Sequence, residues 1–128
     1  MTEFITEGAG VPVAAGPYSA GVVSGELCFL SGQLALDPGG SGLVGETAAD
    51  QARQAMRNLF AVARAGGFAA EEILLINVLL ADGEDFAAVN EAYAAELPEG
   101  HRPARMTFQA GALPAGAKVE VQGFAKHA

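Results

Sequence analysis

Basic residues are scarce in this chain of 128 residues, which holds 7 Lys+Arg against 15 Asp+Glu and carries a formal net charge of -8. No cluster of lysine or arginine occurs along it. A nucleic-acid-binding protein needs a stripe of positive charge to neutralise phosphates, and an anionic membrane surface attracts the same kind of stripe. The composition therefore predicts neither nucleic acid nor a membrane as a partner.

Cysteine and long apolar runs are equally sparse. Cys28 is the only cysteine, so no disulfide can form within the chain, and we expect a buried, unreactive thiol. The longest apolar run, Ile73 to Ala81, is broken by Asn77 and is far too short to span a bilayer. Residues 1–4 show neither the basic nor the apolar region of a secretory signal. We expect a cytoplasmic protein.

Hydrophobic residues, in contrast, are abundant at 51%, which is enough for a packed core. The length predicts a single domain over residues 1–128.

His101 and His127 lack metal-ligand spacing, and the glycine-rich stretch at residues 37–42 matches no phosphate-binding motif. We therefore expect no metal site, and we expect the glycine-rich stretch to be a surface loop.

Apolar periodicity and turn residues predict the element order ββ(β)–α–β–α–β–β. Thr47 can cap a first helix, which Gly66-Gly67 would end, and a second helix is predicted over Phe86 to Leu97. The predicted strands are Phe4–Thr6, Ser19–Gly25, Leu27–Ser31, Ile73–Ala81, Met106–Ala110 and Lys118–Gln122.

This order predicts an α+β fold, a mixed sheet with both helices packed on one face. The run Ile73 to Ala81 is expected to be a central strand covered on both faces. Residues 118–122 alternate, which places Glu120 on the polar face opposite the helices.

Each helix shows an apolar stripe that is expected to face the core. The stripe of the first helix comprises Ala52, Ala55, Met56, Leu59, Val62 and Ala63, and Gln51 falls mostly off it. The stripe of the second helix comprises Phe86, Val89, Tyr93 and Leu97.

Three short signatures suit a pocket for a small carboxylate-bearing molecule. They are Gly16-Pro17-Tyr18-Ser19, Ser31-Gly32-Gln33 and the stretch from Arg105 to Glu120. A guanidinium can hold a carboxylate through two parallel hydrogen bonds, which fixes its orientation as well as adding energy. Arg105, preceded by Pro103-Ala104, is the candidate for that contact.

Each candidate also has a purely structural explanation. Arg105 would then be an exposed arginine on an edge strand, and Glu120 a solvated residue on a polar face. Tyr18 would be an amphipathic turn residue after Pro17. Asn90, beside the apolar stripe of the second helix, would satisfy nearby backbone groups. Taken singly, none of these residues decides between binding and structure.

Taken together, seven motifs in order and spacing resemble the RidA/YjgF family of reactive-intermediate (enamine/imine) deaminases. The resemblance covers about residues 12–126. The motifs are Gly16-Pro17-Tyr18-Ser19, Ser31-Gly32-Gln33, Gln51-Ala52-Arg53-Gln54, the run from Phe86 to Tyr93, Pro103-Ala104-Arg105, Leu113-Pro114 and Lys118-Val119-Glu120-Val121.

The resemblance implies a chorismate-mutase-like fold assembled as a homotrimer, with the sheets forming a central barrel and three clefts between subunits. It also implies an enzyme that hydrolyses 2-imino acids to 2-oxo acids and ammonia. The partners would be small 2-imino and 2-oxo carboxylates. A protonated imine is already electrophilic, so this chemistry requires no metal and no cofactor, only positioning and one water.

Carried over by position, the resemblance implies that Arg105 binds the substrate carboxylate and Glu120 positions the attacking water. Thr107 stands where many family members carry cysteine, so only a backbone role carries over there. The candidate substrate-binding residues are Tyr18, Ser31, Gly32, Asn90 and Thr107.

Two other functions remain open. A non-catalytic module for small carboxylates, acting in regulation, would use the same Arg105 but would not need Glu120 beside an anion. A ribonuclease, a label the family has carried, is disfavoured by the net charge of -8 and by the lack of a basic stripe.

Overall fold

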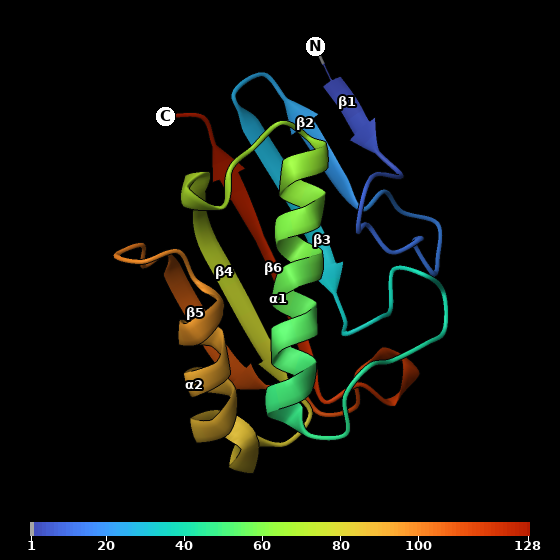
Figure 1. Cartoon of the computed structure of the whole chain (residues 1–128), viewed down its shortest axis with the longest axis vertical. Helices are drawn as coiled ribbons and strands as arrows, with labels where there is room; N and C mark the ends of the chain where they lie inside the picture. The colour runs from blue at the N-terminus through green and yellow to red at the C-terminus, as the bar shows by residue number, and fades with distance from the viewer. Residues whose placement is uncertain (1) are drawn as a thin grey trace.

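The computed structural model describes residues 2–128 and contains one six-stranded sheet in the order β1-β2-β3-β6-β4-β5 (Figure 1). Strands β4 and β5 are parallel, and the other neighbouring pairs are antiparallel. The predicted mixed sheet and element order are confirmed. The strands are β1 (Thr2–Ile5), β2 (Gly21–Ser24), β3 (Leu27–Gln33), β4 (Ile73–Leu80), β5 (Ala104–Gln109) and β6 (Val119–Lys126).

Two helices, α1 (Ala48–Ala65) and α2 (Phe86–Glu96), lie on one face of the sheet, as predicted (Figure 1). Helix α1 begins after Thr47, whose Oγ1 accepts a hydrogen bond from the Asp50 backbone N–H at 3.1 Å. It ends at Gly66, whose N–H bonds back to the last turn. The capping residues thus set both ends of this helix where the sequence places them.

The core lies between the helices and the sheet. The predicted stripe of α1 is buried there. Gln51, expected off the stripe, is instead buried, because its side-chain amide bonds two loops. Its Nε2 donates to the Gly45 carbonyl at 3.1 Å, and its Oε1 accepts from the Lys118 N–H at 2.9 Å.

The expectation of a strand covered on both faces is wrong for β4 within this chain. The helices cover only one face of the sheet, where Ile76, Val78 and Leu80 are buried. Leu75, Asn77 and Leu79 alternate with them and are only half-buried on the other side. In residues 2–128, β4 is therefore covered on one face only.

We call this second side of the sheet the open face. It carries Glu120 and Gln122, as predicted for the face opposite the helices, and Gln122 accepts a hydrogen bond from Asn77 Nδ2 at 3.1 Å. The rest of the open face carries large apolar side chains. They are Phe4, Val22, Phe29, Leu75, Leu79, Met106, Phe108 and Phe124.

Candidate functional site

Arg105 stands on the edge strand β5 and points to the helix side of the sheet. Its Nη1 donates a hydrogen bond to Asn90 Oδ1 of α2 at 2.7 Å. The guanidinium carbon lies 4.9 Å from the centre of the Tyr93 ring. A planar cation over an aromatic face and tied at one nitrogen has few orientations left. The structure therefore supplies an oriented arginine, and Asn90 bonds this side chain rather than backbone groups.

Phe86 was predicted to lie in the buried stripe of α2, and this is wrong: its side chain is exposed. Its ring centre lies 5.9 Å from the Arg105 guanidinium carbon, so it flanks the arginine at the surface. Val89, Tyr93 and Leu97 of the same stripe are buried as expected.

Two buried hydroxyl groups near Arg105 have no hydrogen-bond partner among residues 2–128, and they belong to Tyr93 and Thr107. Burial raises the pKa of Tyr93, with the charges of Arg105 and Arg102 acting in the opposite direction. Buried polar atoms are normally paired, so an orphaned one calls for a partner from outside the chain or a water. We call Asn90, Tyr93, Arg105 and Thr107 the Arg105 cluster.

A second group of predicted residues gathers around Glu120 on β6. A Cβ at position 32 would collide with the Glu120 carboxylate, so the glycine lets this carboxylate lie directly against the β3 backbone. Burial raises the pKa of Glu120 above its ordinary value, and no cation opposes this shift. A carboxylate with a raised pKa accepts a proton more readily near neutral pH than an ordinary glutamate.

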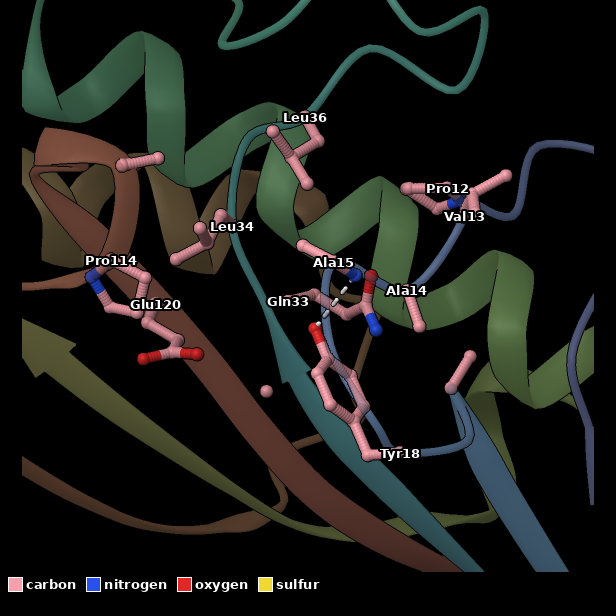
Figure 2. A pocket seen from close by; sticks show the side chains of 13 residues that line it. Pro12, Val13, Ala14, Ala15, Tyr18, Gln33, Leu34, Leu36, Pro114 and Glu120 are labelled. Atoms are coloured by element: carbon pink, nitrogen blue, oxygen red, sulfur yellow. Dashed lines mark hydrogen bonds between the residues drawn. The ribbon is translucent and has the colours of Figure 1, made fainter.

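Tyr18 and Ser31 complete this second group, the Glu120 cluster of Tyr18, Ser31, Gly32 and Glu120. The Tyr18 side chain is half exposed, and its hydroxyl accepts a hydrogen bond from the Ala15 N–H at 3.4 Å (Figure 2). Ser31 Oγ donates to the Ser19 carbonyl at 2.6 Å, which leaves its oxygen free to accept.

Two adjoining hollows meet at the Glu120 cluster and share Tyr18, Gly32, Pro114 and Glu120. The shallow one also contains Ser31. The other is more enclosed, has a volume of about 180 Å³ and is drawn in Figure 2. Apart from Gln33 and the shared residues, its lining is apolar: Pro12, Val13, Ala14, Ala15, Ala20, Leu34, Leu36 and Ala115.

The Arg105 and Glu120 clusters lie on opposite faces of the sheet. Arg105 pairs with Ile76 on β4, which pairs in turn with Gly123 on β6, three residues along from Glu120. Two strand spacings and three residues put the two Cα atoms roughly 14 Å apart, with the side chains diverging. One chain therefore does not bring its two candidate catalytic residues together.

Sequence reasoning missed several residues that shape these clusters. Tyr93 was assigned to the core, yet its ring also supports Arg105. Asn58, fully buried on α1, donates to the carbonyls of Leu34 and Leu36 at 2.9 and 2.8 Å. The sequence offered one indication that Asn58 is buried and hydrogen-bonded, namely that this amide side chain directly precedes a residue of the apolar stripe of the helix.

The structure also bears on the cysteine, on metal binding and on membrane-spanning helices. Cys28 is buried, and its pKa is raised to about 11 by burial and, to a smaller extent, by Glu3, so the thiolate is disfavoured at neutral pH. Within residues 2–128 there is no group of three or more His, Cys, Asp or Glu that could hold a metal ion. In the same part of the chain, no helix has the length and apolarity to cross a membrane.

Comparison with known proteins gives the family. A sequence model of the family described as Endoribonuclease L-PSP matches residues 9–127. The chain is 40% identical over 114 residues, 89% of its length, to the mouse protein named 2-iminobutanoate/2-iminopropanoate deaminase, of which it covers 84%. The chain belongs to the RidA/YjgF family. A plant relative from Arabidopsis thaliana, named Reactive Intermediate Deaminase A, is 40% identical over 87% of this chain and 59% of its own.

Solved structures of RidA/YjgF proteins share the fold. The yjgF gene product of E. coli superposes with a TM-score of 0.88 at 31% identity, covering 98% of this chain and 100% of its own. E. coli TdcF, determined with bound serine, superposes with a TM-score of 0.89 at 31% identity, covering 98% of this chain and 100% of its own. The predicted family and chain fold are thus confirmed.

Proposed function

We propose that this RidA/YjgF protein is a deaminase that hydrolyses small 2-imino acids to 2-oxo acids and ammonia. The observation that carries the proposal is the desolvated carboxylate of Glu120, which faces a cavity and has no cation from residues 2–128 beside it. A binding module for carboxylates gains nothing from such a group, because it repels the ligand's own charge. Relatives at about 40% identity that are named as deaminases support the same function.

The reaction requires that the substrate is held in place, that water attacks the imine carbon and that the C–N bond breaks. Arg105 holds the substrate carboxylate, while Glu120 accepts a proton from a water whose oxygen attacks the imine carbon. The carbon becomes tetrahedral, and the proton passes to the nitrogen. Glu120 then takes the proton of the new hydroxyl group as the C–N bond breaks, so that ammonia leaves and the oxygen forms the carbonyl of the 2-oxo acid. Charge on the protonated imine is stabilised by the Glu120 carboxylate.

A complete site requires two copies of the chain. The carboxylate carbon and the imine carbon of a 2-imino acid are directly bonded, whereas Arg105 and Glu120 lie roughly 14 Å apart on opposite faces of one sheet. We infer that the Arg105 cluster of one copy faces the Glu120 cluster of another. The orphaned Thr107 hydroxyl would then lie in the shared cleft.

The open face supplies the means of assembly. Phe4, Phe29, Met106 and Phe108 are each 45% exposed or more, which is a large apolar area for a monomer to leave in water. We propose a homotrimer whose open faces pack into a central barrel. Light scattering should give about 39 kDa, three times the 13.0 kDa chain. A stable monomer at micromolar concentration would contradict both the trimer and the shared cleft.

The activity is tested by generating 2-iminopropanoate in situ with an amino-acid oxidase and following its loss. The protein should accelerate the loss of imine and release ammonia and pyruvate in equal amounts. Binding of pyruvate without any acceleration would instead establish the non-catalytic module. Cleavage of RNA by a preparation inactive on imines would establish the nuclease.

A further inference from the structure

We propose that the enclosed cavity beside Glu120 binds the side chain of the substrate and selects 2-imino acids with uncharged aliphatic side chains of about four carbons. This inference rests on the proposed deaminase function and specifies the substrate class of that site. Two hollows meet at Glu120, one shallow and one enclosed, and the enclosed one is the cavity in question.

The planar geometry of an imine directs the side chain. Its C2 atom carries the carboxylate, the nitrogen and the side chain at about 120° to one another. Arg105 of a second copy holds the carboxylate outside the cavity, and C2 lies at Glu120 for attack by water. The side chain must then leave C2 away from Arg105, toward the enclosed cavity, which Tyr18 and Glu120 line from opposite sides (Figure 2).

The lining of the cavity fits an apolar group. Alanine, proline, valine and leucine side chains supply most of its wall, and Gln33 is the one uncharged polar side chain besides Tyr18. Its volume of about 180 Å³ is comparable to the roughly 150 Å³ that admits benzene in an apolar cavity. An acidic side chain would meet the Glu120 carboxylate and a chain of net charge -8.

Buried amides hold two parts of the cavity wall in place, the segment of Leu34 and Leu36 and the start of β6. Asn58 binds the carbonyls of Leu34 and Leu36, two residues of the lining. Gln51 bonds the Lys118 N–H two residues before Glu120, and so anchors the start of β6. These hydrogen-bonded parts of the wall resist displacement by a longer group, so the cavity should impose a length limit.

A series of imines with unbranched side chains tests this proposal. From 2-iminopropanoate to 2-iminohexanoate, kcat/KM should rise about fourfold for each added methylene. It should fall again for 2-iminooctanoate, and 2-iminoglutarate should be the poorest substrate. A flat profile with clear turnover would overturn the cavity assignment and leave the deaminase standing. No turnover with any imine would overturn the proposed function itself.

Two variants locate the selectivity. Ala14→Leu fills the cavity, and it should lower the ratio of kcat/KM for 2-iminohexanoate to that for 2-iminopropanoate by at least about tenfold. Leu36→Ala enlarges the cavity and should move the optimum to longer chains. Ala95→Leu, an exposed position on α2, makes the same change in volume elsewhere and should leave the ratio unchanged. If both cavity variants fold and keep the wild-type ratio, the side chain binds elsewhere.

Discussion

Replacing Arg105 by alanine should lower kcat/KM for 2-iminopropanoate about 30- to 1,000-fold, equivalent to ~2–4 kcal/mol of transition-state binding. The loss is large because the guanidinium is already oriented by Asn90 and Tyr93 in the free protein. Its remaining N–H groups bond no other acceptor in the described part of the chain and can hold both carboxylate oxygens.

Arg105→Lys should recover only part of the lost activity, because an ammonium keeps the charge but lacks the planar pair of donors. Arg64→Ala removes the same charge from an exposed site on α1 and should leave the kinetics unchanged. Steady-state rates of imine loss measure all three variants. A lysine variant equal to the wild type would contradict two-point binding of the carboxylate.

Replacing Glu120 by glutamine should lower kcat about 100- to 10,000-fold, because the amide cannot accept the proton of the attacking water. Affinity for pyruvate, measured by calorimetry, should stay the same or increase, since a repelling charge is removed. Glu91→Gln, on the exposed surface of α2, is the matched control and should behave as the wild type. Full turnover in the Glu120 variant would show that this carboxylate takes no part in the chemistry.

The pH dependence provides a second measurement on Glu120. Burial raises its pKa, so the reactive carboxylate is lost as the pH falls through a value above the usual range of glutamic acid. The acid limb of kcat/KM should lie at that raised pKa and disappear in Glu120→Gln. The same burial disfavours the charged form in the folded protein at neutral pH, so the variant should be at least as stable to heat as the wild type.

Local features of the sequence predicted much of the fold. Thr47 and Gly66 set the ends of α1 because capping depends only on nearby backbone groups. Alternation along β6 placed Glu120 opposite the helices for the same reason. Burial of Gln51 was not predictable in this way, because its partners Gly45 and Lys118 are distant along the chain.

The resemblance predicted the residues of the candidate site and clefts between subunits, but it did not assign Arg105 and Glu120 to different subunits. The motif resemblance named Arg105 and Glu120 together, whereas strand pairing places them on opposite faces. Pairing of β4 with both β5 and β6 decides that separation, and neither local propensity nor spacing encodes it. The half-buried second side of β4 was likewise not predictable from its apolar composition, because the helices pack on one face of the sheet only.

The central claim, that two copies share one catalytic site, is tested by mixing the two inactive variants. Arg105→Ala and Glu120→Gln chains are co-expressed with different tags, and trimers that contain both are purified. Every such trimer holds one of its three sites with both residues intact, so imine hydrolysis should return to about one third of the wild-type rate. If Arg105 and Glu120 of one chain form the site, no site is intact and the mixed trimers stay as inactive as either variant alone.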